Sequence, residues 1–315
     1  MSSAETGASL DTLRIPVGEV SLSSRLGGYY LDLTSVLPLV ESGYHGPLDP
    51  RGVPMSRVGP GAPVYSVITI AQYALALHDA CRQAESDALA AKLRTQLEAI
   101  LEQVEWRGPR RGFSVHRWTD VKYRNLRAPW VSALSQGNAI SALLRGHALL
   151  GDRKLLEAAS LMFEALEQPL ETGGVRDTDI CGHLWFEEYP TEPPLHVLNG
   201  FIFALWAVLD FARVTGNEKA WRWWNEGVAT LRAHLPEFDC GYWSVYDLRY
   251  RELVSRHYQV NVHVPQLNAM HRLTGDDVFR VYAERWRGFA DRLWCRGRWW
   301  VSLRLHALRR GYRFD

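Results

Sequence analysis

A recurring helix–glycine–helix pattern is the feature of this sequence that most restricts its fold. A helical run ends in GD or GN and a second one starts at once around Gly151, Gly216 and Gly275, so the pattern recurs after 65 and then 59 residues. Glycine readily adopts the left-handed conformation that ends a helix, and the Asp or Asn that follows can cap the next helix. Each unit is therefore predicted to be an antiparallel helix hairpin followed by a substantial loop.

Such hairpins cannot bury their apolar faces alone, which predicts that they stack side by side. Apolar residues follow helical spacing from Tyr65 onward, whereas the chain before about residue 63 is rich in Gly, Pro and Ser. We predict an all-α fold, an α/α barrel (toroid) of about four helix hairpins with a short irregular or β N-terminal segment. An open solenoid is the competing arrangement.

The chain is expected to divide into three parts: an N-terminal extension (residues 1–26), a barrel domain (27–294) and a basic C-terminal tail (295–315). The tail either binds an anionic polymer or forms a final amphipathic element on the barrel. The whole chain has 36 Lys and Arg against 35 Asp and Glu, a net charge of +1, so we expect no nucleic acid and no membrane partner. A basic loop that either contacts a carboxylated substrate or is a solvated surface contains His116, Lys122, Arg124 and Arg127.

Cysteine usage and the N-terminal sequence indicate the cellular setting. The N-terminus is polar and lacks a basic start followed by an apolar core, which favours a cytoplasmic protein. No CxxC pair or other metal-site spacing is present, so neither a metal nor a cofactor is expected. A homodimer is compatible with the sequence. The widely spaced cysteines, expected to be reduced and mostly buried, are Cys81, Cys181, Cys240 and Cys295.

Three loops combine ionisable side chains with aromatic and proline residues: HLWFEEYPTEPP, GYWSVYDLRY and RHYQVNVHVPQL. Two earlier segments, TIAQY and PWVSALSQGNAIS, place Gln72 and Gln136 on helices. Several of the 13 tryptophans, including Trp118 and Trp185, lie in or near loops. Aromatic rings can stack on the C–H face of a sugar, although core filling explains tryptophans equally well.

A set of sequence blocks occurs here in the order of a known enzyme domain: YYLDL, TIAQYALAL, PWVSALSQGNAIS, GGVR, WFEEYPTEPPLHVLNGFIFAL, YDLR and HVPQL…LTGDDVF…AERW. They resemble the catalytic C-terminal domain of the D-glucuronyl C5-epimerases, which convert D-glucuronate to L-iduronate within heparan-type chains such as heparosan. The similarity covers residues 27–286, and the EEYP…LNGF and YDLR blocks are its most specific parts. It implies an α/α barrel and a cofactor-independent epimerase for a uronic-acid-containing saccharide, either a polymer or a small glucuronoside.

The resemblance also implies the site residues. Carried over by motif, they are Glu188, Tyr189, Tyr246, Arg249 and, ahead of the HxxQL stretch, Tyr258. Tyr258 lies five residues before His263 instead of the four that the family pattern has, so an insertion, or a residue such as Gln259 facing the substrate, would remove Tyr258 from the site. The predicted substrate-binding residues are Arg249, His263, Gln136, Gln72, Asn199 and Trp185.

The reaction explains these residue types. Inverting C5 removes a proton beside a carboxylate and returns one from the opposite face, so two acid/base groups must flank the sugar. We predict Tyr246 and Tyr189 as this pair, with Glu188 as an accessory base or orienting group. Arg249 is expected to neutralise the carboxylate and to lower the pKa of Tyr246. A uronate lyase, which shares the first step, and a non-catalytic carbohydrate-binding protein are the alternatives.

Overall fold

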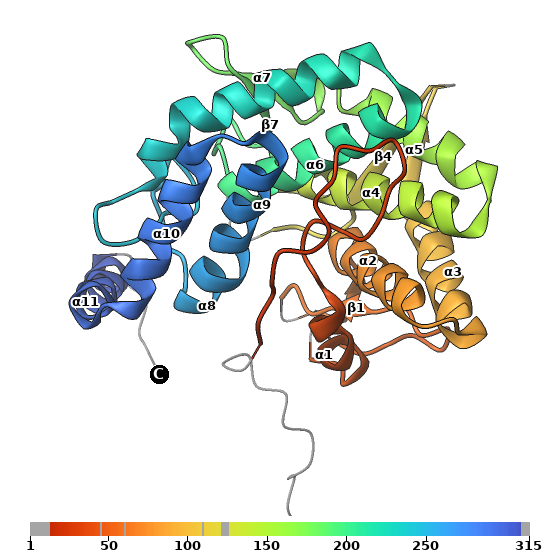
Figure 1. Ribbon diagram of the computed structural model, residues 1–315, viewed down its shortest axis with the longest axis horizontal. Helices are drawn as coiled ribbons and strands as arrows, with labels where there is room; N and C mark the ends of the chain where they lie inside the picture. The colour runs from red at the N-terminus through yellow and green to blue at the C-terminus, as the bar shows by residue number, and fades with distance from the viewer. Residues whose placement is uncertain (1–12, 45, 60, 109, 121–125, 310–315) are drawn as a thin grey trace, which may run out of the picture.

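The computed structural model describes residues 13–309 except 45, 60, 109 and 121–125. Its main elements are consecutive antiparallel helix pairs around a common core (Figure 1). The pairs are α2 (Val67–Gln83) with α3 (Asp87–Glu102), α4 (Ala133–Leu150) with α5 (Arg153–Ala165), α6 (Leu198–Thr215) with α7 (Glu218–His234), and α9 (Val264–Thr274) with α10 (Asp277–Asp291). The prediction of helix hairpins is confirmed.

Short elements fill the connections between the pairs. Before α2 lie η1 (Thr34–Val36), α1 (Leu37–Glu41) and the antiparallel strands β1 (Met55–Ser56) and β2 (Val64–Tyr65). Between α3 and α4 a sheet of order β3-β4-β5 contains β3 (Val104–Arg107), β4 (Arg111–His116) and β5 (Trp130–Val131). Between α5 and α6 lie η2 (Leu170–Thr172) and the hairpin β6 (Arg176–Thr178) and β7 (Leu184–Phe186). The remaining elements are η3 (Leu235–Phe238), α8 (Arg256–Tyr258), the π-helix η4 (Gln259–His263) and α11 (Leu293–Arg309).

Helix caps occur where the glycine pattern places them. Gly151, Gly216 and Gly275 are the C-caps of α4, α6 and α9, with φ of 71°, 69° and 70°, a conformation that favours glycine. The Asp or Asn that follows each glycine is the N-cap of the next helix and accepts a hydrogen bond from a backbone N–H in its first turn. Local chemistry therefore determines where these hairpins turn.

The first helices of the pairs form the inner wall of the barrel. α4 packs against both α2 and α6, and a Cβ atom on Gly137 of α4 would lie only 2.8 Å from the Cα atom of Ala204 on α6. By length and composition α6 could cross a membrane, but 89% of its apolar window is buried inside the protein. α6 is therefore apolar because it is a buried helix at the centre of the barrel.

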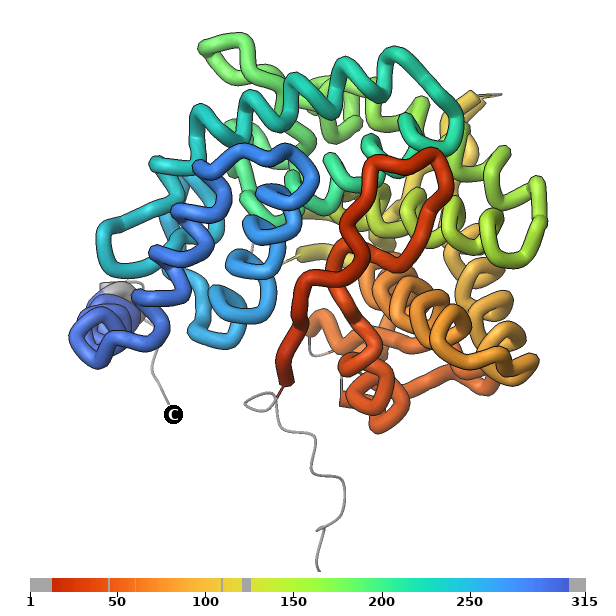
Figure 2. The backbone as a smooth tube through the Cα atoms, viewed as in Figure 1, coloured from red at the N-terminus to blue at the C-terminus, as the bar shows by residue number. Residues whose placement is uncertain are grey.

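The N-terminal segment lies between the last and first helix pairs (Figure 2). The backbone N–H of Ile15 donates to Oδ1 of Asn261 in η4 over 3.3 Å, and Arg213 of α6 donates to the carbonyl oxygens of Ser23 and Arg25. Residues 13–26 are therefore part of the barrel's contact network, and a boundary at residue 26 does not separate two structural units.

A buried ionic cluster joins this segment to the inner helices. Asp210 of α6 accepts hydrogen bonds from Arg145 of α4 at 2.5 Å, from Tyr30 at 2.7 Å and from Ser141 at 2.8 Å. The side chains of Arg145 and Asp210 are completely buried. Each charge is thus paired by several hydrogen bonds, which is how proteins tolerate a buried ion pair.

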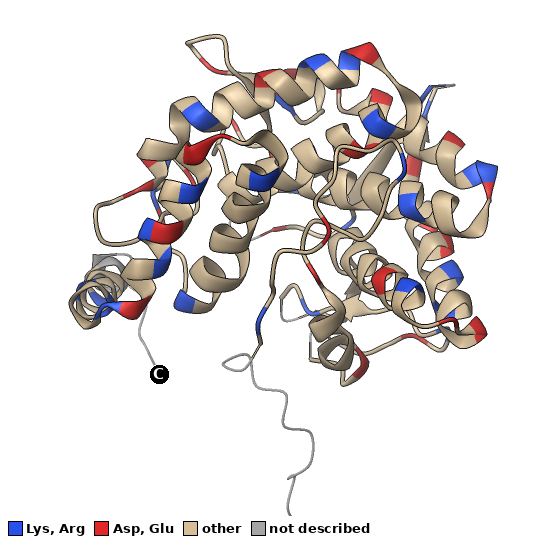
Figure 3. Cartoon of the chain, viewed as in Figure 1, with Lys and Arg blue, Asp and Glu red and all other residues tan. Residues whose placement is uncertain are grey.

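The basic C-terminal tail is helical over most of its length. The ring of Trp299 in α11 stacks on Trp243 with centroids 5.1 Å apart, and its Nε1 donates to the carbonyl oxygen of Val254 over 2.9 Å. Figure 3 shows positively and negatively charged residues interspersed along the described helices. The interpretation of the tail as a final helical element on the barrel fits this packing.

Candidate active site

The centre of the candidate site is a hydrogen bond between a buried carboxyl group and a tyrosine. Glu188 follows strand β7, and its Oε1 accepts from the hydroxyl of Tyr246 over 2.8 Å. The two residues lie 58 positions apart. The loops meet because Leu198, at the start of α6, donates its backbone N–H to the carbonyl oxygen of Tyr246, and Val197 forms a β-bridge with Asp247.

Gly200 makes room for this carboxyl group. A Cβ atom at Gly200 would lie 2.4 Å from Oε2 and 2.7 Å from Cβ of Glu188, distances that real Cβ contacts do not reach. The glycine of the LNGF block therefore has a packing function, since it lets Glu188 rest against the first turn of α6.

Burial raises the pKa of Glu188 to about 7, because the ionised carboxylate loses its contact with water. Hydrogen bonding by Tyr246, Tyr189 and Asn199 lowers this pKa, and the neighbouring charge of Glu187 raises it. The carboxyl group is thus poised between its protonated and ionised forms near neutral pH. A pKa near the working pH is what a group that both accepts and returns protons requires.

Buried polar atoms without a hydrogen-bond partner among the described residues also occur on side chains linked to Glu188 through Asn199 or through Tyr246 and Tyr258. They belong to three residues besides Glu188, whose own Oε2 is one of them: Asn199 (Oδ1), His263 (Nε2) and Gln266 (Oε1). Gln266 donates to the carbonyl oxygen of Asn199, which keeps the two side chains adjacent. Buried polar atoms are nearly always satisfied in proteins, so such a concentration marks a place where a polar ligand can bind.

The π-helix η4 explains the unusual spacing between Tyr258 and His263. The backbone N–H of Val264 bonds to the carbonyl oxygen of Gln259, an i→i+5 bond that accommodates one extra residue per turn. Tyr258 consequently packs edge-on against both the His263 ring, at 5.2 Å, and the Tyr246 ring, at 5.8 Å. The extra residue does not remove Tyr258 from the site.

Gln259 has a structural role instead. It is completely buried, accepts hydrogen bonds from the backbone and hydroxyl of Ser244, and donates to the carbonyl oxygen of Trp286. The alternative in which Gln259 replaces Tyr258 in the site is therefore wrong.

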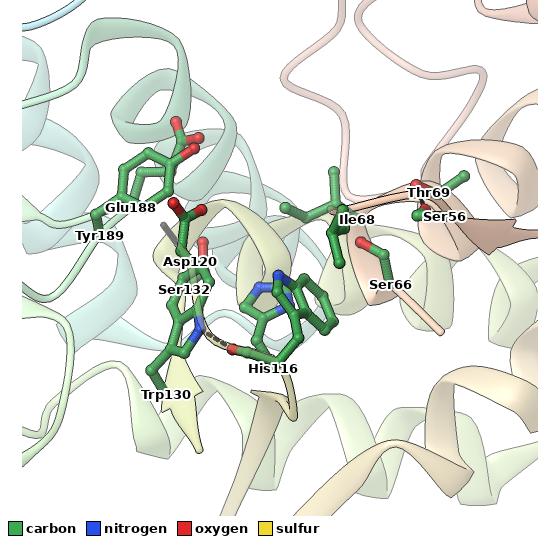
Figure 4. Close-up of a pocket in the computed structure, with 12 residues that line it drawn as sticks. Ser56, Ser66, Ile68, Thr69, His116, Asp120, Trp130, Ser132, Glu188 and Tyr189 are labelled. Atoms are coloured by element: carbon green, nitrogen blue, oxygen red, sulfur yellow. Dashed lines mark hydrogen bonds between the residues drawn. The ribbon is translucent and has the colours of Figure 1, made fainter. Parts of the chain in front are cut away.

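A cavity of about 370 Å³ opens beside Glu188 and Tyr189 (Figure 4). The ring of Trp130 stacks on Tyr189 at 5.8 Å and 28°, and its Nε1 donates to the carbonyl oxygen of Trp118. Trp118 is partly exposed and lines the same cavity. Among the described residues, the lining also includes Ser56, Ser66, Thr69, His116, Asp120 and Ser132.

His116 lies at the wall of this cavity, between two tryptophan rings. Its ring centroid is 4.3 Å from that of Trp118 and 4.2 Å from that of Trp130. Neither ring nitrogen has a hydrogen-bond partner in the described part of the chain, and burial lowers the pKa of His116 to about 3. His116 is thus a neutral hydrogen-bonding group, not the cation of a solvated basic loop. No local signal reveals this, because the burial is created by the tryptophans around it.

The structure describes one further member of the predicted basic loop. Arg127 is exposed, and Lys122 and Arg124 lie outside the described residues.

Arg249 does not occupy the position predicted for it. Its guanidinium group is exposed, and Nε donates to the hydroxyl of Tyr250 over 3.0 Å. A tight turn, closed by a hydrogen bond from the Tyr250 backbone N–H to Asp247, directs the residue outward. The hydroxyl of Tyr246 donates to the acid Glu188, and the expected effect of Arg249 on the pKa of Tyr246 stays a prediction.

Two of the predicted substrate contacts are structural residues. Trp185 is completely buried, its ring stacks on His196 at 4.4 Å, and it has no free face for a sugar. Gln136 donates to the carbonyl oxygens of Gly112 and Met162 over 2.7 Å each. Both side chains are thus engaged within the fold, and a substrate contact by either one stays a prediction. Gln72 is half-buried on α2, and its role stays a prediction.

The comparison with protein families relates this geometry to known proteins. Residues 111–288 match the family described as the C-terminus of D-glucuronyl C5-epimerase. The chain belongs to this family. It is 32% identical to D-glucuronyl C5-epimerase of Caenorhabditis elegans over 200 residues, which cover 58% of this chain and 32% of that protein.

A second relative is an uncharacterized protein of Methanocaldococcus jannaschii, 35% identical over 167 residues, with coverage of 52% of this chain and 53% of that protein. The chain thus spans about half of this relative and about a third of the nematode enzyme. Among solved structures, cellobiose 2-epimerase from Spirochaeta thermophila superposes with a TM-score of 0.52 at 17% identity, covering 82% of this chain and 68% of that one. At this identity the match concerns the fold, and the predicted α/α barrel is confirmed.

Proposed function

We propose that this family member is a cofactor-independent epimerase that inverts C5 of a D-glucuronate unit. The observation that carries the proposal is the buried carboxyl group of Glu188, whose pKa is about 7 and whose Oε1 accepts the hydrogen bond from Tyr246. Tyr189 also hydrogen-bonds to this carboxyl group and borders the cavity where a sugar would bind. Family membership supplies the reaction type, and the site supplies residues suited to it.

The proposed reaction moves one proton off C5 and another onto its opposite face. Ionised Glu188, oriented by Tyr246, accepts the C5 proton, and the electron pair of the C–H bond passes into the substrate carboxylate to form an enediolate. The hydroxyl of Tyr189 then donates its proton to the other face of C5. Once the product has left the space between the two groups, Glu188 returns its proton to the Tyr189 phenolate through the hydrogen bond that they form in the free protein, which restores both groups.

This proposal changes the roles expected from the sequence. Glu188, instead of Tyr246, becomes the primary base, because a carboxyl group with a pKa near 7 is ionised in about half of the molecules at neutral pH. Tyr246 becomes the donor that orients this carboxylate. Tyr258, packed against Tyr246, completes the aromatic wall on that side.

Substrate binding is proposed to use the cavity beside Tyr189. The partly exposed ring of Trp118 is the candidate sugar-stacking surface, and the unpartnered nitrogens of His116 can bond to a sugar hydroxyl or carboxylate oxygen. A unit of a polymer and a small glucuronoside both fit this proposal, since both present the same ring and carboxylate.

Incubation with heparosan and with simple glucuronosides in D₂O, followed by NMR, tests the proposal. Deuterium at C5 together with an iduronate signal is the expected result, and an intact C5–H in every uronate tested would refute it. Chain shortening with an unsaturated uronate chromophore would instead identify a lyase. The Tyr189→Phe and Tyr246→Phe variants should lose exchange, whereas Tyr250→Phe, a matched change beside exposed Arg249, should retain it.

A further inference from the structure

A mixed aspartate–histidine cluster lies outside the cavity, where the β6–β7 turn meets the end of α7. Three atoms converge there: Oδ2 of Asp179, Nδ1 of His183 and Nε2 of His234. The distance from Asp179 is 3.1 Å to His183 and 2.8 Å to His234, and the two histidine nitrogens are 3.0 Å apart. The proposed epimerase chemistry uses none of these groups.

The spacing of these atoms suits a single metal ion. A triangle with edges of about 3 Å allows one ion to lie about 2 Å from all three corners, slightly above their plane, which is the usual zinc–nitrogen and zinc–oxygen distance. Hydrogen bonding alone fits less well. If both rings donated N–H to the same carboxylate oxygen, two N–H groups whose nitrogen atoms are only 3.0 Å apart would converge on one acceptor.

The surroundings hold each ligand in a metal-binding orientation. Oδ1 of Asp179 accepts the backbone N–H groups of Cys181, at 2.8 Å, and of His183, at 2.9 Å, while Oδ2 faces the histidines and also accepts from Nε1 of Trp185 over 3.4 Å. Backbone N–H donors of this kind favour the ionised form of a carboxylate, which is the form that binds a metal ion.

His234 adds a second, independent observation. Its other ring nitrogen, Nδ1, pairs with Oε1 of Glu237 over 2.7 Å. A carboxylate that accepts from the non-ligating nitrogen fixes the tautomer and makes the ligating nitrogen more basic, as in carboxylate–histidine–zinc arrangements. The nitrogen that faces Asp179 and His183 is thereby presented as a lone pair.

A neighbouring group of one histidine and two acidic residues does not have the geometry of a metal site. His196 pairs through Nδ1 with Glu187 at 2.7 Å and through Nε2 with Asp177 at 3.8 Å. The two nitrogens of one ring point in different directions, so they cannot both bind the same ion. Oε2 of Glu187 already accepts two backbone N–H groups. This second group is an ion pair that orders the loop before α6.

We infer that Asp179, His183 and His234 form a divalent-metal site that prefers zinc, with its remaining coordination positions open to water. Two imidazoles and one carboxylate are a common zinc ligand set. Bound metal would connect the β6–β7 turn to α7 and so hold the strand that leads to Glu188. Asp179 and His183 are four residues apart but His234 is 51 residues beyond His183, which is why no metal spacing is visible in the sequence.

The inference is tested on the full chain, freed of metal by a chelator and titrated with Zn²⁺ and with Co²⁺. We expect one equivalent per chain, visible Co²⁺ absorption bands typical of nitrogen and oxygen ligands, and a higher melting temperature with Zn²⁺. His183→Ala and His234→Ala should each weaken binding at least tenfold. The matched control is His271→Ala, which removes a half-buried histidine at the end of α9 that bonds only to a backbone carbonyl in the described structure.

Circular dichroism of each variant verifies that it is folded. If His234→Ala unfolds, the test rests on the Zn²⁺ affinity of His183→Ala, because His183 is the more exposed ligand. Equal Zn²⁺ affinity in wild type, His183→Ala and His271→Ala, or no stoichiometric binding by wild type, would overturn the site. Because the readouts are metal content, spectra and melting temperature, they are independent of whether the protein has epimerase activity.

Discussion

Replacing Glu188 with glutamine is expected to abolish proton exchange at C5 and, at the same time, to stabilise the fold above neutral pH. Glutamine has the shape of a protonated carboxyl group and can still accept the hydrogen bond from Tyr246. Its amide cannot accept the proton from C5 of the substrate. It also carries no charge, so its burial does not incur the cost of desolvating an ion.

The magnitude follows from the pKa of Glu188, which burial raises from 4.5 to about 7. Each pKa unit corresponds to about 1.4 kcal/mol, so ionising this group in the folded protein costs about 3 kcal/mol. The pKa of Glu188 is higher in the folded than in the unfolded protein, so protonation of this group stabilises the fold. This stabilisation is fully present below pH 4.5 and is lost as the pH rises to about 7. Glu188→Gln does not titrate and should avoid that loss.

Urea unfolding followed by tryptophan fluorescence at about pH 5 and pH 8 measures this difference. We expect the free energy of unfolding of Glu188→Gln, relative to wild type, to increase by about 2.5 kcal/mol between the two pH values, because a small part of the loss has already occurred at pH 5. Solvent exchange at C5, measured on the same preparations, should be lost at both.

The adjacent variant Glu187→Gln is the matched control. Glu187 is buried and pairs with His196 at 2.7 Å; burial lowers the pKa of His196, but the bond to Glu187 outweighs this and raises it. A raised histidine pKa contributes stability below about pH 6.5 that is lost as the pH rises through the folded pKa. Glu187→Gln should therefore destabilise the protein most at pH 5, the opposite pattern to Glu188→Gln.

Two results would refute the reasoning about Glu188. An unfolding free-energy difference between Glu188→Gln and wild type that stays constant from pH 5 to pH 8 would mean that the carboxyl group is not held at a raised pKa. Undiminished C5 exchange in Glu188→Gln would remove it from the role of base.

Three further changes test other parts of the structure. Tyr246→Phe removes a donor that lowers the pKa of Glu188, so the pH-dependent change in stability should move to higher pH. If urea unfolding at a series of pH values shows this change centred at the same pH as in wild type, the hydrogen bond has no such effect. Gly200→Ala places a Cβ atom 2.4 Å from Oε2 of Glu188, so we expect about a 100-fold loss of C5 exchange with an unchanged circular dichroism spectrum; full activity would contradict the packing. Asp210→Asn leaves Arg145 buried without its counter-charge and should cost about 3–5 kcal/mol of unfolding free energy, whereas a cost under about 1 kcal/mol would show that the ion pair is dispensable.

Features that depend on neighbouring residues could be predicted from the sequence. The glycine C-caps, the Asp and Asn N-caps and the helix pairs follow from backbone conformations and hydrogen bonds within a few residues. The candidate residues in the EEYP and YDLR blocks were identified by their resemblance to a family, and the structure brings Glu188, Tyr189, Tyr246 and Tyr258 together.

The direction of side chains within those blocks could not be predicted. Arg249 belongs to the same short block as Tyr246, yet a turn places it at the surface, and Trp185 is three residues before Glu188 but is completely buried. The spacing of Tyr258 depends on a π-helix, which has no clear sequence signal. Trp185 is buried by residues far along the chain, such as His234, whereas the turn at Arg249 and the π-helix are local features that no motif in the sequence identifies.

The sequence by itself therefore determined the helix hairpins, their caps and the family, because these depend on local chemistry and on blocks of adjacent residues. Only the tertiary structure decided the chemistry of the site. The pKa of Glu188 is set by burial among loops and helices that meet on folding, and the neutral state of His116 by the tryptophans around it. The Asp179–His183–His234 cluster likewise exists because folding joins the β6–β7 turn to α7.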